Sequence, residues 1–472
     1  MSEFLTAAEA AQRLGVKPAT LYAYVSRGVL RRDHTADGRR SLFDSDEVER
    51  LARRGRPRRP AGAADITVES AITEITGDRL HYRGLDVNRL ATSRTFEDVA
   101  ELLWTGDLPA AQPGRGAQPA QPGRGAQPAQ PGRGAQPPRS APWRATPAAL
   151  AAGRGAQAAL PAGTLPLERF QVIVPAMAAT DPLRLQLDRA AVLAAGRSII
   201  AGLVDCLPLA SPAAAAAPTS LASSASPDAS TSLAFPASSA SPASAVTALV
   251  APDYPISDYP IADRLWSRLC ERRPSPALRR ALSAALILLA DHELAASTLA
   301  VRVAASVRAD PYAVVETGMG AMSGALHGGA SLGAETLLAA ASGPDDVPRV
   351  VGELLRRGER VPGFGHFVYR AGDPRAVLLF DLVRRAAPKS RQLAVAEAVL
   401  AEMRRKSLPE PNVDLAIATL ARVAGMIRGS GEAIFAVART AGWIAHALEA
   451  YAGPGPLRPR AVYTGRPPAA GA

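Results

Sequence analysis

From residue 275 onward the pattern of apolar and polar positions is helical, and almost nothing alternates with a period of two. Several segments open with Ser or Asp followed by Pro, and proline is favoured in the first turn of a helix. The expected helix starts are Pro276, Pro311, Asp345, Pro374, Asn412 and Glu432. The helix that begins at Asp345 is expected to end at Gly358, the one from Asn412 at Met426, and the one from Glu432 at Tyr451. We therefore predict a mainly α fold for this part of the chain.

The beginning of the chain predicts two short helices joined by a turn. Thr6 is placed to cap the first helix, and Glu9 three residues later completes a capping box. Gly15 ends that helix, Pro18 opens the second, and Gly28 ends the second. Two short helices joined by a glycine-containing turn are typical of a helix-turn-helix.

The residues that follow resemble the wing of a MerR-type winged helix-turn-helix. Residues 31–43 predict a hairpin with Asp37-Gly38 at its turn, and 46–54 predict a third short helix. The segment is rich in arginine, so we assign residues 1–54 to a DNA-binding domain. A small helical dimerisation or docking module is the alternative. The residues expected to contact DNA are Lys17, Thr20, Tyr22, Arg27, Arg39 and Arg40.

A basic linker rich in Pro and Gly, residues 55–64, separates this module from the rest. Beyond it, 73–76 and 80–82 predict short strands around a tight turn. Thr95 is expected to cap a helix that runs to Trp104 and ends at Gly106. Residues 164–204 are expected to be helical.

Two stretches of low complexity interrupt the pattern. Residues 111–137 are copies of AQPGRGAQP, and a Pro- and Gly-rich repeat cannot pack a core. The second stretch is rich in Ser, Ala and Pro and almost uncharged. We predict disordered insertions at about 110–160 and 208–250.

Composition narrows the class of protein further. Hydrophobic residues make up 47% of the chain, so most of it is expected to be globular. The net charge of +11 fits binding of nucleic acid or of anionic small molecules. Cys206 and Cys270 are far apart, which offers no disulfide framework and no paired metal ligands. The N-terminus lacks the features of a signal peptide, and no apolar run could span a bilayer. We expect a cytoplasmic protein that does not enter membranes.

The candidate chemistry centres on two histidines beside glycines, His327 and His366, with His292 upstream and Asp414 downstream. Histidines and a carboxylate are the parts needed for acid–base chemistry near neutral pH. Asp414 lies at a helix start, where the macrodipole favours an ionised carboxylate. A neutral histidine can donate to a developing enolate oxygen, and arginines can clamp carboxylates. This set suits carbon–carbon bond formation between a thioester enolate and a keto-acid. No spacing suggests a metal. The nearby arginines are Arg375, Arg439 and Arg458.

The motifs around these residues resemble the citrate synthase family. They read, in order, ADHE at 290–293, ALHGGA at 325–330, GFGHFVYRAGDPRA at 363–376, NVD at 412–414, ARTAGWIAHALE at 438–449 and RPRAVYTG at 458–465. The resemblance implies a two-domain helical fold preceded by the winged helix-turn-helix. It implies a large domain over 65–294 and 412–472 and a small one over 295–411.

The resemblance also implies roles. Asp414 would take a proton from the methyl group of acetyl-CoA, and His327 would stabilise the enol. His366 would polarise the carbonyl of oxaloacetate and protonate the new alkoxide. No cofactor is implied, since acetyl-CoA is a substrate, and the family forms homodimers. Oxaloacetate would be held by His292, Arg375 and Arg439, with Arg458 reaching the site of the other chain; the turn near CoA would be Pro362, Gly363, Phe364 and Gly365.

Two positions depart from the family pattern, Phe367 and Ala295, and neither removes a catalytic group. Phe367 leaves the acyl group open, so propionyl-CoA, which gives 2-methylcitrate, is an alternative substrate. A second alternative is a transcriptional regulator that uses the synthase fold as a metabolite sensor. His446 and His81 are interpreted as core histidines without a role in catalysis.

Overall fold

The computed structural model describes residues 4–14, 21, 25, 30–31, 33–34, 41–45, 47–48, 68–109, 142–210, 258–369, 372–459, 461 and 464–465. The chain divides into two compact units, one made of Met1–Glu69 with Arg458–Ala472 and the other of Ser70–Leu457. Each unit is described by itself.

The described part of the first unit contains strands β1 (Phe4–Thr6), β2 (Asp33–His34) and β3 (Ser41–Asp44) and helix α1 (Ala7–Leu14). The strands form an antiparallel sheet in the order β1-β3-β2, which confirms the paired wing strands and adds β1, which the sequence did not predict. The capping box is confirmed, because the Thr6 amide donates to Glu9 at 2.8 Å and the Glu9 amide donates to Thr6 Oγ1 at 3.4 Å.

A small apolar core holds this unit together. Its buried side chains come from α1, from the wing strand β3 and from positions along the rest of the module. They are Ala10, Ala11, Leu21, Leu30, Phe43 and Val48. The turn at Asp37-Gly38 lies outside the described residues, and so do Lys17, Thr20, Tyr22, Arg27, Arg39 and Arg40. Their DNA contacts stay predictions.

The second unit begins with a small antiparallel sheet and continues as helices. The sheet has the order β4 (Thr73–Thr76), β5 (Arg79–Tyr82), β6 (Leu85–Asp86). The helices are α4 (Val87–Ser93), α5 (Phe96–Thr105), α6 (Pro147–Ala158), α7 (Pro166–Ala178), α8 (Arg189–Cys206), α10 (Ile261–Leu269), α11 (Pro276–Leu289), α12 (Ala296–Ser306), α13 (Pro311–Met322), α14 (Gly329–Ala340), the 3-10 helix η2 (Pro344–Asp346), α15 (Val347–Arg356), α16 (Pro374–Ala386), α17 (Arg391–Arg405), α18 (Val413–Ala424) and α19 (Ser430–Ala452).

Helix starts marked by a capping residue and proline agree with the sequence. Helices α11, α13 and α16 begin at their prolines, after N-caps whose side chains accept a backbone N–H. The predicted helix after Thr95 is confirmed, with Gly106 in the left-handed conformation at its end. The predicted strand pair is confirmed as β4 and β5. These features are local, which is why the sequence reveals them.

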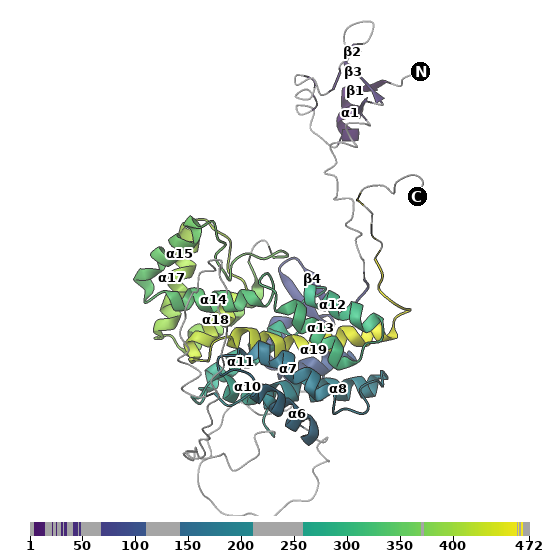
Figure 1. Ribbon diagram of the computed structural model, residues 1–472. Coiled ribbons are helices and arrows are strands. Elements are labelled where there is room, and N and C mark those ends of the chain that lie inside the picture. Colours follow the sequence, from purple (N-terminus) through teal and green to yellow (C-terminus); the bar gives the residue numbers. More distant parts are fainter. Residues whose placement is uncertain are drawn as a thin grey trace, which may run out of the picture. The chain divides into compact units, whose positions relative to one another are not determined.

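Helix α19 lies at the centre of the second unit. Nearly every residue from Ser430 to Ala447 is buried, and the helix packs against α5, α8, α11, α12 and α13. Figure 1 shows α19 running between these helices. Most of its side chains are apolar, and a helix that is apolar on nearly all sides is expected to lie in a core. It carries Arg439, so the core of the unit also supplies part of the predicted site.

Two groups of helices can be distinguished within this unit. Helices α14, α15, α17 and α18 pack on one another, and α16 packs on both α18 and α11. Helices α15 and α17 lie farthest from the helices around α7 and α8 (Figure 1). Helices α12 and α13 pack on α19, and α13 also packs on α7. We therefore propose that the small domain begins near residue 323 rather than at 295, and that it includes α18.

Described residues that flank the two low-complexity stretches form a helix and make specific side-chain contacts. The prediction that the first insertion reaches about residue 160 is wrong, because 147–158 form α6. Ala and Gly dominate α6, so its composition concealed a helix. Arg144 pairs with Asp258, and the buried Arg264 Nε donates to Asp205 at 3.0 Å. These contacts join the flanks of both stretches.

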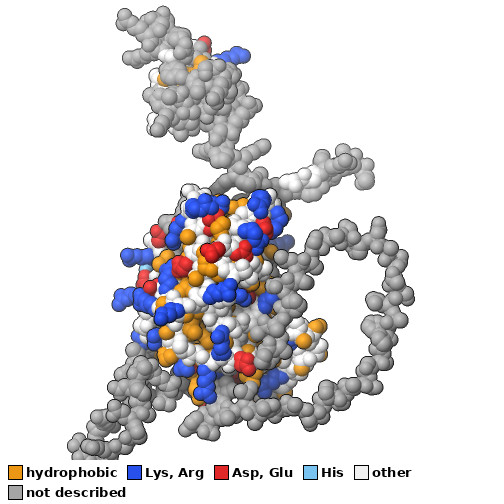
Figure 2. Space-filling view, turned by 90° about the vertical axis from the view of Figure 1, so that its left-hand side faces the viewer, with side chains coloured by type: hydrophobic (Ala, Val, Ile, Leu, Met, Phe, Trp, Pro, Cys, Tyr) orange, Lys and Arg blue, Asp and Glu red, His pale blue; other side chains and the backbone are white. Residues whose placement is uncertain are grey.

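Charge is spread over the face of the second unit that Figure 2 shows. On the face shown in Figure 2, Lys and Arg side chains lie among hydrophobic and acidic ones and do not gather in one patch. Among the described residues, no helix is long and apolar enough to cross a membrane.

Candidate active site

Most of the predicted residues of the second unit lie at or between helix ends, and Arg439 lies within α19. His292 follows α11, His327 lies between α13 and α14, and His366 lies between α15 and α16. The rings of His292 and His366 are 5.2 Å apart, and His366 Nε2 is 3.4 Å from Nη2 of Arg375 in the first turn of α16. The described chain therefore brings residues from distant segments into one place.

His327 is held by a chain of side chains. Trp443 Nε1 donates to Ser297 Oγ at 3.3 Å, and Ser297 Oγ lies 2.7 Å from His327 Nε2. The Ser297 hydroxyl accepts from Trp443 and still has its own proton to donate, so we assign that proton to His327 Nε2. With this assignment the ring proton of His327 is on Nδ1. Burial, with a smaller effect of Arg439, lowers the pKa of His327 to about 4, so the ring is neutral near pH 7.

The His366 ring is held by backbone amides of the residues that follow it. The amides of Val368 and Tyr369 donate to His366 Nδ1 at 3.0 and 3.3 Å. The two amide contacts are shorter than the 3.4 Å approach of Arg375 Nη2 to Nε2, so we assign Nδ1 as the acceptor and place the ring proton on Nε2. Arg375 Nη2 and His366 Nε2 are then two neighbouring donors that share no hydrogen bond. Burial, followed by the charge of Arg375, lowers the pKa of His366 to about 4. The Nε2–H of His366 is a donor beside a cation.

The loop before His366 requires glycine. Gly363 and Gly365 have φ values of 82° and 80°, in the left-handed region. A Cβ on Gly363 would lie 2.7 Å from Leu415 Cβ. The Gly363 carbonyl accepts from the Asn412 amide at 2.9 Å, which joins this loop to the start of α18. The loop of Pro362, Gly363, Phe364 and Gly365 is thus fixed beside the helix that carries Asp414.

Arg375 forms a buried two-point ion pair with the carboxylate of Asp373. Its Nε and Nη2 donate to Asp373 at 2.9 and 2.8 Å, and both side chains are buried. Burial alone would lower the pKa of Arg375, but the Asp373 charge and hydrogen bonds raise it above its usual range. The same Asp373 carboxylate accepts from the Val413 amide at 3.0 Å. The guanidinium is therefore positioned by the start of α16 and the start of α18.

Arg439 carries a donor that nothing satisfies within the described chain. Its Nε donates to the Leu289 carbonyl at 2.9 Å, while its buried Nη1 has no hydrogen-bond partner. Burial lowers the pKa of Arg439 to about 10. An unsatisfied buried guanidinium N–H is costly unless an acceptor occupies the site. A bound carboxylate supplies such an acceptor.

His292 completes this cationic end of the site. Its Nε2 lies 3.1 Å from the Tyr369 hydroxyl. Burial, then Arg375 and Arg439, hold the pKa of His292 well below its usual value. A neutral histidine between two arginines suits a dianionic ligand, since it can add a hydrogen bond without needing a proton from solution.

Asp414 differs from the prediction in its electrostatics. We expected the helix start to favour its ionised form, but burial dominates and raises the pKa of Asp414 to about 6. Ser331 Oγ donates to Asp414 Oδ1 at 2.5 Å. A carboxylate with a raised pKa is a stronger base than an ordinary one and is still mostly ionised at pH 7.

Sequence reasoning missed the supporting residues. Ser297, Ser331, Asp373 and Tyr369 each contact a predicted site residue, and Trp443 contacts Ser297. Asp373 and Tyr369 lie close in sequence to Arg375 and His366, so they had a local signal. The other three contact the site across large separations in sequence, which spacing does not reveal.

The structure also bears on Arg458, Phe367 and the space beside His366. Arg458 is exposed and belongs to the first unit by contacts, so its reach into another chain stays a prediction. The Phe367 side chain is fully exposed, so the fold of the unit does not require an apolar residue there. A cavity of about 260 Å³ borders His366, Tyr369 and Asp373. Among the described residues, no cluster of His, Cys, Asp and Glu could hold a metal ion.

Comparison with protein families gives two matches. Residues 62–460 match the family model of the citrate synthase C-terminal domain, and residues 4–56 match a helix-turn-helix domain. "Citrate synthase 2" of Bacillus subtilis is 37% identical over 221 residues, 45% of this chain and 58% of that protein. "Citrate synthase" of Haloferax volcanii is 38% identical over 196 residues, 41% of this chain and 52% of that protein. The chain spans about half the length of the curated relatives it matches.

Solved structures share the fold. The citrate synthase of Thermotoga maritima aligns with a TM-score of 0.59 and 23% identity, over 86% of this chain and 96% of its own. The ternary complex of carboxymethyl coenzyme A and oxaloacetate with the Thermoplasma acidophilum citrate synthase aligns with a TM-score of 0.60 and 21% identity, over the same shares. At this identity the likeness concerns the fold.

Proposed function

The chain belongs to the citrate synthase family, and on that premise we propose that it condenses acetyl-CoA with oxaloacetate to give citrate and CoA. One observation carries the proposal. Two histidines whose pKa values of about 4 keep them neutral near pH 7, one contacted by Ser297 and the other beside Arg375, accompany a carboxylate with a pKa of about 6. A site with two neutral donors and one base suits enol formation followed by carbonyl addition.

In the first step Asp414 removes a proton from the methyl group of acetyl-CoA. The Nδ1–H of His327 donates to the thioester oxygen as negative charge develops there, which gives the enol. The pKa of about 6 favours this transfer, because a base works best when its pKa lies near the operating pH. Ser297 and Trp443 hold the ring in the required tautomer.

In the second step the enol carbon attacks the keto carbon of oxaloacetate. The Nε2–H of His366 polarises that carbonyl and supplies the proton to the new alkoxide. His292, Arg375 and Arg439 bind the two carboxylates. Water then cleaves the thioester of citryl-CoA, which yields citrate and CoA. The unsatisfied Nη1 of Arg439 supports the assignment of this end to an anion.

The acyl group is the finer part of the proposal. We propose acetyl-CoA as the preferred substrate, with propionyl-CoA, giving 2-methylcitrate, as the competitor. One methylene in an apolar pocket is worth about 10- to 200-fold in discrimination. The ratio of kcat/KM for the two thioesters, each with saturating oxaloacetate, decides between them.

The first unit is proposed to bind DNA, and the chain is proposed to act as a homodimer in which Arg458 reaches the site of the other chain. The match of residues 4–56 to a helix-turn-helix domain supports the DNA part. Binding to duplex DNA should weaken steeply with salt, because phosphate contacts release counterions. Negligible affinity at low salt would favour a docking module instead.

The test of the enzymatic proposal is release of free thiol from acetyl-CoA by the purified chain. We expect release that depends on oxaloacetate and that yields citrate. A folded chain that releases no CoA with either thioester, yet binds a DNA operator, would identify a regulator that uses the fold as a sensor.

A further inference from the structure

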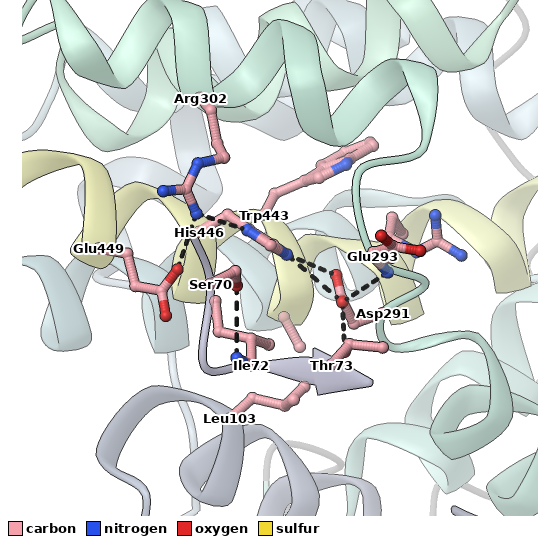
Figure 3. A network of polar contacts seen from close by, with 12 residues as sticks. Ser70, Ile72, Thr73, Leu103, Asp291, Glu293, Arg302, Trp443, His446 and Glu449 are labelled. Atoms are coloured by element: carbon pink, nitrogen blue, oxygen red, sulfur yellow. Dashed lines mark hydrogen bonds and ion pairs between the residues drawn. The ribbon is translucent and has the colours of Figure 1, made fainter. Parts of the chain in front are cut away.

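A buried polar network lies behind the oxaloacetate end of the site, and its centre is His446 (Figure 3). His446 on α19 and Asp291 after α11 are both fully buried. His446 Nε2 lies 3.3 and 3.4 Å from the two oxygens of Asp291. On the other side, His446 Nδ1 lies 3.0 Å from Arg302 Nη1. The sequence alone suggested an ordinary core histidine.

The partners of His446 define its tautomer. A guanidinium has only donors, so His446 Nδ1 must accept from Arg302 and cannot carry a proton. The proton is therefore on Nε2 and is directed at Asp291. Arg302 is fixed in turn, because its Nη1 also donates to Glu449 at 2.7 Å, and Glu449 accepts from the Ala71 amide at 2.9 Å. Figure 3 shows the contacts of Arg302 with His446 and Glu449.

The Asp291 carboxylate fixes the backbone next to His292. Its Oδ2 accepts from Thr73 Oγ1 at 2.5 Å and from the Glu293 amide at 3.1 Å. Glu293 has a φ of 53°, in the left-handed region that non-glycine residues rarely adopt. A strained residue persists only where its surroundings fix it, and here the Asp291 carboxylate does so. The strained turn is adjacent to His292.

Helix α19 approaches this segment unusually closely. A Cβ on Gly442 would lie 2.4 Å from both the Ala290 carbonyl and Asp291 Oδ1. The Gly442 amide donates to Ala290 at 3.0 Å, one turn after Arg439 donates to Leu289. The helix that carries Arg439 is thus joined directly to the turn that carries His292.

We propose that His446 and Asp291 are positioning residues for the keto-acid substrate. The Nε2–H of His446 orients the Asp291 carboxylate, that carboxylate fixes the turn at Glu293, and the turn aims His292 at the ligand. The assignment rests on the proposed function. It predicts an effect on oxaloacetate and none of similar size on acetyl-CoA, whose proposed residues are His327 between α13 and α14, Asp414 on α18 and the loop at 362–365.

Two substitutions at one position test it. His446→Gln can keep an amide N–H for Asp291, while His446→Asn can keep an acceptor for Arg302 but loses the donor to Asp291. We expect His446→Asn to raise the KM for oxaloacetate at least about tenfold, the size of one charge-assisted hydrogen bond. We expect His446→Gln to recover most of that loss and the KM for acetyl-CoA to stay within about twofold in both.

Thr73→Val is a second variant, in which the new side chain has nearly the same shape as threonine. Thr73 is the first residue of strand β4. The substitution removes the hydroxyl from Asp291, so a smaller rise in the KM for oxaloacetate is expected. Calorimetric titration of oxaloacetate and a thermal melt accompany the kinetics. Equal losses in both His446 variants, or losses shared by acetyl-CoA, would show a purely structural role. If the wild-type chain binds oxaloacetate but forms no citrate, the proposed function fails while the binding comparison still stands; if it binds no oxaloacetate, both fail.

Discussion

The two histidines of the site are held in opposite ways. His327 depends on the side chains of Ser297 and Trp443, which come from α12 and α19. His366 depends on the amides of Val368 and Tyr369, which lie in its own loop. The first arrangement joins distant segments, and the second is local. The tautomer of His327 can therefore be changed by one side-chain substitution, whereas that of His366 is encoded in the backbone.

The largest expected effect is that of Asp414→Asn. The amide cannot take a proton from the methyl group, so kcat should fall by about 100- to 10,000-fold. Oxaloacetate is held at the other end of the site, and its affinity should change little. Ser331, which bonds Asp414, offers a matched comparison, because Ser331→Ala keeps the base and should cost far less turnover.

Ser297→Ala tests the first histidine directly. Without that hydroxyl, His327 Nε2 loses its donor and the ring can place its proton on the wrong nitrogen. We expect kcat to fall by about 10- to 100-fold with little change in the KM for oxaloacetate. Ser267→Ala is the control, since among the described residues that hydroxyl donates to the Arg264 carbonyl within its own helix, α10. A Ser297→Ala enzyme with normal kcat would mean that the side-chain relay does not set the tautomer.

The pH dependence of turnover sharpens the role of Asp414. Burial raises the pKa of Asp414 to about 6, and the base acts only when ionised. Activity should therefore be full above that pKa and fall about tenfold per pH unit as the pH drops below it. An ordinary aspartate would keep the enzyme active to about pH 4. Initial rates in buffers of constant ionic strength, with a stability check at each pH, separate the two.

Tyr369→Phe tests the contact that supports His292 while leaving the backbone contact with His366 in place. The substitution leaves the Tyr369 amide, and hence the His366 tautomer, unchanged, but removes the hydroxyl that lies 3.1 Å from His292. We expect a rise in the KM for oxaloacetate of about threefold to tenfold and a kcat close to that of wild type. A large fall in kcat with an unchanged KM would show that the hydroxyl takes part in the chemistry.

The smallest effect is expected from deleting residues 111–137. The described residues that flank this repeat are fixed by contacts such as Arg144 with Asp258. Neither histidine depends on them, so both KM values and kcat should stay within about twofold. Gel filtration and a thermal melt provide the check. Loss of the soluble protein on deletion would contradict the prediction that the repeat is a dispensable insertion.

The sequence predicted what local chemistry determines. Helix starts at Pro276, Pro311 and Pro374 follow from their caps, and the box at Thr6 and Glu9 follows from spacing. The residues of the two histidine loops and Asp414 stood out through the family resemblance. That resemblance also supplied roles that no spacing could give.

What the sequence did not reveal arises from tertiary contact. Ser297 is 30 positions from His327 along the chain, and Trp443 is 146 from Ser297, so nothing local marks them. Helix α6 was concealed by its Ala- and Gly-rich composition. The raised pKa of Asp414 also escaped prediction, since burial in the folded unit outweighs the helix-start effect.

The most direct test measures oxaloacetate binding and CoA release in the same preparations of the wild-type chain and Asp414→Asn. We predict that both bind oxaloacetate with similar affinity by calorimetry, and that only the wild type releases CoA from acetyl-CoA at an appreciable rate. A variant that loses oxaloacetate binding, or that keeps its turnover, would contradict the claim that Asp414 acts on acetyl-CoA while other residues bind oxaloacetate.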